Sequence, residues 1–187
     1  MAREVLYCQI NPHFLLNSLN SAYWLAKMNS QNGTDRYLSQ LTAILRYSLG
    51  QDGQRQTLRR EIEMLRVYLE LERQRSDFEY SIEVEDGAYL DAPSPRLLIQ
   101  PIAENSICHG IGVGGKLEVA IGRRASWIEI SVLDDGIGID EETIQRLYTN
   151  MEQPAGSSGI GLRYVRTVMR AYYGEEATMI IQSSKGT

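Results

Sequence analysis

The period of the hydrophobic pattern changes once along the chain, near Asp77. Before that point apolar residues recur every three or four positions, as they do on the buried face of a helix. Three helices are predicted there, over residues 4–28, from a turn at residues 30–35 to residue 49, and onward from Thr57 as the N-cap. The apolar face of the first contains Cys8, Leu15, Leu19, Ala22 and Ala26, and that of the third contains Leu58, Ile62, Leu65 and Leu69. Helices with one apolar stripe each bury only a small hydrophobic core by themselves. We therefore expect a helical hairpin that is completed by a second copy in a four-helix dimer.

After Asp77 apolar and polar residues alternate, which is typical of half-buried strands. Strands are predicted at residues 80–84, 117–121, 128–132 and 178–183, and the second and third form a hairpin. Helices are predicted at residues 94–108, with Ser94 as N-cap, Pro95 in the first turn and a kink at Pro101, and at residues 160–173, ending at Gly174.

This mixture of elements predicts an α+β fold. A helical dimerisation module at residues 1–76 is followed by a two-layer α/β sandwich with a mixed, largely antiparallel sheet at residues 77–187. The sequence opens in helical residues and stops after a strand that has no later partner. We therefore expect the second domain to lack its C-terminal end and the chain to be part of a larger protein.

Composition and charge limit the classes of protein to which this chain can belong. The chain of 187 residues is 43% hydrophobic and 23% charged, as in ordinary soluble globular proteins, which excludes general disorder. Its net charge of -5 argues against a surface that binds nucleic acid. The chain has only two cysteines, no apolar run long enough to span a bilayer and no signal peptide, so a cytoplasmic location is expected.

Two polar clusters in the second domain could hold phosphates and their metal ion. Residues 100–110, QPIAENSICHG, place Glu104 and Asn105 at the edge of an apolar helix face. One Asn amide is sufficient for a Mg²⁺ ion that keeps several waters beside the phosphates. Residues 156–162, GSSGIGL, open a helix whose first backbone amides can bind phosphate. Taken singly, the first cluster is better explained by a helix-capping or surface Asn, and the second is equally well explained by a flexible loop.

A third cluster, LDDGIGI at residues 133–139, ends a predicted strand. The carboxylate of Asp134 can accept a hydrogen bond from an exocyclic amine such as that of adenine, and Gly136 and Gly138 allow a flat ring to approach the backbone. Taken singly, this pattern is also a common turn. Residues 141–155 have few core anchors, and we expect them to act as a lid.

The order of the three clusters distinguishes them from isolated turns and loops. A helix with Asn, a strand that ends in Asp-x-Gly-x-Gly and a glycine-rich loop before a helix are the elements of the Bergerat ATP fold, so the chain resembles the GHKL ATPase superfamily. No Walker-type P-loop or protein-kinase motif occurs. Residues 110–116, GIGVGGK, follow a helix and precede a strand, which is the reverse of a P-loop.

Residues 9–20, QINPHFLLNSLN, resemble the phosphoacceptor box of the LytS/YesM type of sensor histidine kinases. The resemblance extends through LRREIEMLRVYLELERQR to the nucleotide motifs. It implies a homodimer that uses ATP and Mg²⁺ to phosphorylate His13 and then passes the phosphoryl group to an aspartate of a response regulator. It also implies a parent protein that reaches the membrane through N-terminal segments outside this sequence.

The resemblance assigns roles to individual residues. Its catalytic set is His13, Asn17 and Glu104, and Asn105 is the metal ligand. Its nucleotide-binding set is Asn105, Cys108, His109, Asp134, Gly136, Gly138, Gly156, Ser157, Ser158, Gly159, Ile160, Gly161 and Leu162.

The residues around His13 are consistent with a phosphoacceptor. On a helix His13, Asn17 and Asn20 share one face, displaced by one position from the apolar seam, so we expect an exposed imidazole. An imidazole with a pKa of about 6.5 is mostly neutral at cytoplasmic pH and has a nucleophilic nitrogen. Phe14 occupies the position where many histidine kinases have an acid, so the general base stays open. Pro12 is either a hinge or the first residue of the helix.

Two positions depart from the family pattern. Cys108 stands where a basic residue often contacts the phosphates, and Tyr164 where an Asn is usual. An impaired or non-catalytic ATP-binding scaffold is therefore the main alternative, and an ATP-hydrolysing member of the superfamily is the third. A thiol enzyme based on Cys108 and His109 is disfavoured, because neighbouring helix residues point about 100° apart.

Overall fold

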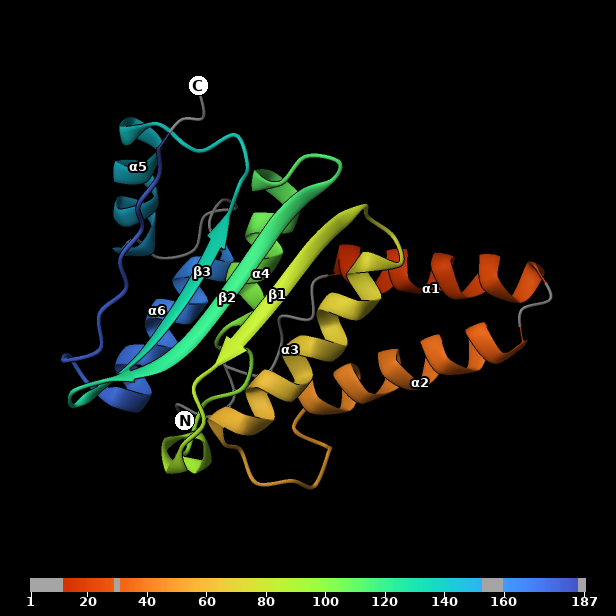
Figure 1. Ribbon diagram of the computed structural model, residues 1–187, viewed down its shortest axis with the longest axis horizontal. Coiled ribbons are helices and arrows are strands. Elements are labelled where there is room, and N and C mark those ends of the chain that lie inside the picture. Colours follow the sequence, from red (N-terminus) through yellow and green to blue (C-terminus); the bar gives the residue numbers. More distant parts are fainter. Residues whose placement is uncertain (1–11, 29–30, 153–159, 185–187) are drawn as a thin grey trace. The chain divides into compact units, whose positions relative to one another are not determined.

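The computed structural model describes residues 12–28, 31–152 and 160–184 (Figure 1). The helices and strands are α1 (Pro12–Lys27), α2 (Gln31–Ser48), α3 (Leu58–Arg73), β1 (Phe78–Val84), the 3-10 turn η1 (Ala88–Asp91), α4 (Gln100–Asn105), the π-helical turn η2 (Ser106–Gly110), β2 (Gly115–Arg124), β3 (Trp127–Asp134), α5 (Glu141–Glu152) and α6 (Ile160–Tyr173). No described helix is both long and apolar enough to cross a bilayer.

The chain forms two compact units. One contains Met1–Arg55 and Glu63–Arg75, and the other contains Gln56–Ile62 and Ser76–Thr187. The first turns of α3 therefore belong with the α/β unit, although the sequence places them in the helical domain. The domain boundary after residue 76 stays a prediction.

In the helical unit α1 and α2 form a hairpin (Figure 1). Helical spacing predicts an apolar face on α2 that includes Tyr37, Leu38, Leu41, Ile44 and Leu45. Tyr37, Leu41 and Ile44 are buried, but Leu38 is 41% exposed, so the prediction is only partly correct. Helix α2 already begins at Gln31, so the predicted turn at residues 30–35 is wrong over its described part. Asn, Gly and Asp favour turns, but they are also tolerated at a helix start, where the first amides need no helical partner.

The apolar seam predicted for α1 is only partly correct. Ala22 is buried, but Leu19 is 56% exposed and Ala26 is exposed as well. The buried side chains described on α1 are Ser18 and Ala22, which lie one helical turn apart. Residues 4–11 of the predicted helix, including Cys8, lie outside the described part of the chain, as does the side chain of Leu15.

Helix α3 follows its sequence pattern closely. The backbone amide of Arg60 donates a hydrogen bond to Thr57 Oγ1 at 3.2 Å, so the predicted N-cap is confirmed. All four predicted face residues, Leu58, Ile62, Leu65 and Leu69, are buried.

The α/β unit is built on a mixed sheet, as expected, and its strands have the order β1-β2-β3. Strand β1 pairs in parallel with β2, because the connection between them contains α4, and β2 pairs antiparallel with β3 across a short turn. Leu117, Val119 and Ile121 of β2 are buried in the core of this unit. Figure 1 shows α4 and α6 on one face of the sheet.

The helix predicted at residues 94–108 begins later than expected. Leu97 has a φ of +56°, which a right-handed helix does not allow, and α4 starts only at Gln100. Pro101 consequently lies in the first turn, where no hydrogen bond is lost, and the predicted kink is wrong.

The strand predicted at residues 178–183 is not formed. The amide of Ile181 bonds to Tyr148 Oη at 2.8 Å, and Ser183 Oγ accepts a bond from the amide of Ile139. Alternation predicts a strand only where another strand pairs with it, and these bonds involve side chains instead. Helix α6 ends as predicted, before Gly174 with its φ of +82°.

Candidate functional site

Helix α4 and the π turn η2 carry the first group of predicted site residues. Asn105 ends α4, is half-buried, and its side-chain amide has no hydrogen bond to any other residue that the structure describes. The amide of Ile111 donates to Ser106 O at 2.8 Å, which is the five-residue bond of a π turn. Such turns are frequent at functional sites. The amide of Asn105 is thus available to an external ligand.

The far end of this π turn meets the end of strand β3. The amide of Ile137 donates to Gly110 O at 3.1 Å. A Cβ atom added to Gly136 would stand 2.0 Å from the same carbonyl oxygen, and one added to Gly110 would stand 2.8 Å from Asp134 Oδ1. Only glycine fits at Gly136 while the two segments keep this contact, and a side chain at Gly110 would displace the Asp134 carboxylate.

Gly110 is the last residue of the predicted QPIAENSICHG cluster, but no role was predicted for it. In the sequence it appears as the first glycine of a misleading GIGVGGK run. Its contact with Asp134 spans 24 residues and depends on how η2 packs against β3. No local signal distinguishes it from the glycines that follow.

The two neighbouring aspartates at the end of β3 have different environments. Asp135 Oδ1 accepts the Lys116 amide hydrogen at 2.7 Å, which fixes the end of the sheet. Asp134 Oδ1 accepts the Gly136 amide hydrogen at 3.1 Å, and its Oδ2 has no partner in the described part of the chain. Asp134 is therefore the carboxylate that can bind a ligand.

The start of α6 forms the third side of the candidate site, beside α4 with η2 and the end of β3. A Cβ atom on Gly161 would lie 3.3 Å from Pro101 Cβ and 3.8 Å from Asn105 Nδ2, so the first turn of α6 runs directly beside α4. Leu162 is buried beneath it, and Ile160 is the first residue of the helix. Gly156, Ser157, Ser158 and Gly159 lie outside the described residues.

The remaining predicted residues are more dispersed. Glu104 is half-buried beside Asn105, and Cys108 and His109 are exposed on η2. Gly138, with a φ of +65°, follows Gly136 in a backbone conformation that favours glycine. His13 and Asn17 lie on α1, but their side chains are outside the described part, so the predicted exposure of the imidazole is not tested.

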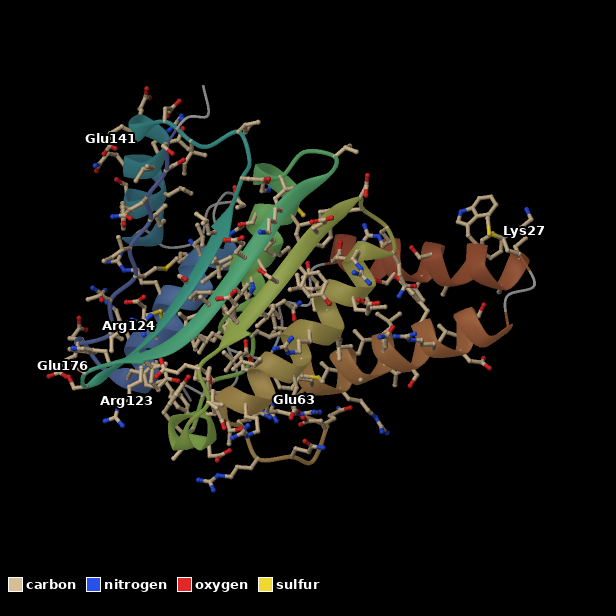
Figure 2. All side chains as sticks on the ribbon, viewed as in Figure 1. Lys27, Glu63, Arg123, Arg124, Glu141 and Glu176 are labelled. Atoms are coloured by element: carbon tan, nitrogen blue, oxygen red, sulfur yellow. The ribbon has the colours of Figure 1, made fainter. Side chains whose placement is uncertain are left out.

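The two arginines of the β2–β3 hairpin lie at the opposite end of β3 from Asp134. Figure 2 shows Arg123 and Arg124 at the hairpin end of the sheet, where Arg124 pairs with Trp127. Asp134 pairs with Leu117 at the opposite end. These two arginines therefore supply no phosphate contact.

The donor set fits Mg²⁺ that is held largely by phosphates. No group of three or more His, Cys, Asp or Glu side chains gathers among the described residues, so a dedicated protein cage is lacking there. Mg²⁺ prefers oxygen ligands and retains several waters when it binds with phosphates. The uncommitted amide oxygen of Asn105 is a suitable single protein ligand.

Tyr164 lies one turn past Gly161 on α6, and its hydroxyl donates a hydrogen bond to Arg96 O at 3.1 Å. Burial, together with the negative charge of Glu61, raises the pKa of Tyr164 from 10.0 to about 12. The neutral phenol is thus favoured in the folded protein.

The Tyr164→Phe variant should respond differently to alkaline pH. A tyrosine in the unfolded chain ionises near pH 10.0, whereas Tyr164 in the folded chain stays neutral until about pH 12. Its contribution to stability is present below the unfolded pKa and is lost as the pH rises through the folded pKa. Over that window the wild type should lose about 2 kcal/mol more than Tyr164→Phe, allowing for partial exposure. Denaturant unfolding of both proteins from neutral to alkaline pH measures this; parallel curves would contradict it.

The chain matches the models of two protein families. Residues 1–79 match the family model described as "Histidine kinase", and residues 90–187 match the model described as "Histidine kinase-, DNA gyrase B-, and HSP90-like ATPase". Sensor histidine kinase YesM of Bacillus subtilis is 29% identical over 98% of this chain and 32% of its own length.

Two further relatives are similar over the same range. Sensor histidine kinase YpdA of Escherichia coli is 30% identical over 92% of this chain and 30% of its own length. Sensor histidine kinase/phosphatase LytS of Staphylococcus aureus is 31% identical over 97% of this chain and 32% of its own length. The chain thus spans about a third of the length of these curated relatives.

Proposed function

Because this chain belongs to the family of histidine kinase-, DNA gyrase B- and HSP90-like ATPases, we propose that it is the catalytic part of a two-component sensor histidine kinase. The match of residues 1–79 to the histidine kinase model supports this choice within the family. In the proposed reaction His13 is phosphorylated from ATP, and the phosphoryl group then passes to an aspartate of a response regulator. The parent protein is a homodimer whose membrane anchor precedes this sequence.

One observation carries the nucleotide part of the proposal. Asn105 and the Asp134–Gly136 turn lie at the two ends of one π turn, and Gly161 of a third element lies beside Asn105. Asp134 would accept a hydrogen bond from the adenine amine, Asn105 would be a ligand of Mg²⁺, and the backbone amides at the start of α6 would hold phosphate. ATP, when bound, supplies the γ-phosphoryl group.

The acceptor chemistry rests on His13. A neutral imidazole nitrogen forms the bond to phosphorus while the bond to the ADP oxygen breaks, and the ring proton passes to a base. Because Phe14 follows His13, that base is another group or water. No strong base is needed for a nitrogen that is already neutral at cytoplasmic pH.

Labelling with γ-phosphate-labelled ATP and Mg²⁺ tests the function. The wild type should incorporate label in an acid-labile, alkali-stable bond, and neither His13→Gln nor Asn105→Asp should do so. His13→Gln should still bind nucleotide, which separates loss of the acceptor from loss of the site. Release of free phosphate without labelling would indicate a hydrolase. Absence of both labelling and phosphate release would indicate a scaffold.

The second candidate is a non-catalytic or impaired ATP-binding scaffold. Cys108, exposed on η2, carries no positive charge for the phosphates, and the Tyr164 hydroxyl is engaged by Arg96 O. Loss of one charged contact with the phosphates raises the activation free energy of phosphoryl transfer by about 3 kcal/mol. A Cys108→Arg variant that gains label over the wild type would support an impaired kinase.

Asn17 is predicted to act in dephosphorylation of the regulator. It lies one helical turn beyond His13, where an amide can orient a water molecule. Asn17→Ala should lower phosphatase activity toward a phosphorylated receiver domain by about tenfold, while autophosphorylation changes little. Radiolabel on each protein can be followed over time, and equal loss of both activities would refute this division of roles.

A further inference from the structure

The segment just before α4 has a strained backbone. Leu97 adopts a φ of +56°, in the left-handed region that side chains other than glycine rarely enter. Such a conformation persists only where the surrounding structure enforces it. The segment ends at Ile99, which is fully buried and whose carbonyl accepts the first hydrogen bonds of α4 from Ile102 and Ala103.

A buried carboxylate holds this segment from one side. Glu61, on the first turn of α3, is only 2% exposed. Its Oε2 accepts the Leu97 amide hydrogen at 3.0 Å, and its Oε1 accepts the Ile99 amide hydrogen at 2.9 Å. Hydrogen bonds to a charged acceptor are stronger than neutral ones, and two of them fix orientation as well as position.

A tyrosine holds the same segment from another element. The Tyr164 hydroxyl, on α6, donates to the carbonyl of Arg96 at 3.1 Å. Tyr164 follows the glycine-rich loop by a single turn, and Gly161 of that turn lies beside Asn105. The segment from Arg96 to Ile99 therefore has hydrogen bonds to two helices, to α3 through Glu61 and to α6 through Tyr164.

These hydrogen bonds determine where the first turn of α4 lies. Pro101 has no amide hydrogen, so the first turn of α4 lacks one of the donors that could anchor it. Its position is set by Ile99, and the position of Ile99 is set by Glu61. A shift of this residue would be carried along a rigid helix of six residues to Asn105.

We propose that Glu61 and Tyr164 are positioning residues of the nucleotide site, which lock residues 96–99 and thereby place the Asn105 amide for Mg²⁺. The proposal rests on the proposed function, because it requires that Asn105 binds the metal of Mg·ATP. Glu61 touches no nucleotide in this arrangement and acts only through α4.

The test compares two buried glutamates of the same helix in the full chain. Glu61→Gln keeps the shape but turns a donor toward one of the two backbone amides. Glu72→Gln is the matched control, because Glu72 is also buried, at 5% exposed, and its carboxylate pairs with the Arg75 side chain at 2.6 Å. Dissociation constants are measured for Mg·ATP and for metal-free ADP, alongside the thermal unfolding midpoint of each protein.

Glu61→Gln should weaken Mg·ATP binding at least tenfold and metal-free ADP binding by less than threefold, as expected when Asn105 is displaced. Glu72→Gln should leave both constants within twofold of the wild type. Tyr164→Phe, which loses only one hydroxyl, should weaken Mg·ATP binding about threefold, and its effect should not multiply with that of Glu61→Gln.

Three outcomes would overturn the proposal. In the first, the wild type binds Mg·ATP and both Glu61→Gln and Tyr164→Phe bind it equally well. In the second, Glu61→Gln and Glu72→Gln weaken binding in parallel with equal losses in melting temperature, which indicates only a loss of fold stability. In the third, the wild type binds no Mg·ATP, and then the proposed function fails as well. Because Tyr164→Phe is a mild change, it remains informative where Glu61→Gln unfolds.

Discussion

Replacing Gly136 by alanine should remove Mg·ATP binding and destabilise the α/β unit by about 3 kcal/mol. The new Cβ atom would stand 2.0 Å from the carbonyl oxygen of Gly110, and backbone cannot rotate away as a side chain can. Either η2 or the end of β3 must then move. Because Asn105 precedes η2 and Asp134 ends β3, at least one of the two ligand groups would be displaced, and the two would no longer keep their relative positions.

Gly112→Ala is the matched control for this prediction. Gly112 lies two residues after Gly110, and a Cβ atom there meets nothing within 4 Å. This variant should bind nucleotide as the wild type does and be equally or slightly more stable, since alanine restricts the unfolded chain. Thermal unfolding and nucleotide titration of both variants check the prediction. Similar behaviour of Gly136→Ala and Gly112→Ala would show that the contact with Gly110 is unimportant.

The second large effect is expected at Asp134. In Asp134→Asn only one oxygen remains, so either the Gly136 amide or the adenine amine faces a donor instead of an acceptor. Loss of a charged hydrogen bond and an opposed donor together should raise the dissociation constant of ATP on the order of 100-fold. Guanine offers a carbonyl in place of the amine, so selectivity for ATP over GTP should fall as well.

Asp135→Asn provides the comparison. Asp135 is exposed, and an Asn there can still accept the Lys116 amide hydrogen through its oxygen. Nucleotide affinity should change less than threefold, because a surface carboxylate contributes little to a site that it does not face. Equal losses in the two variants would mean that net charge, rather than one positioned carboxylate, governs binding.

Elements whose stabilising contacts are local could be predicted from the sequence. The four-residue spacing of Leu58 and Ile62 gave the buried face of α3, and Thr57 capped it, because both signals depend on neighbours within one turn. The hairpin of β2 and β3 was likewise predictable from alternation on both sides of a short turn.

Elements governed by distant contacts were missed. Ser94 and Pro95 suggested a helix start, but Glu61, which lies 36 and 38 residues from Leu97 and Ile99, holds those amides outside a helix. Glu61 is an acidic residue near the start of a predicted helix, and nothing in the pattern indicates that it is buried. The same limit applies to the site, where the motifs around Asn105 and Asp134 were visible but their common partner, Gly110, was not.

Calorimetric titration of the full chain with Mg·ATP, at two temperatures so that a zero enthalpy is not mistaken for no binding, measures most directly whether Asn105 and Asp134 form a nucleotide site. We expect one ATP bound per chain, and affinity on the order of 100-fold lower for Asn105→Asp, whose added negative charge faces the triphosphate. Absence of binding by the wild type, or equal affinity of Asn105→Asp and the wild type, would contradict the assignment of this site.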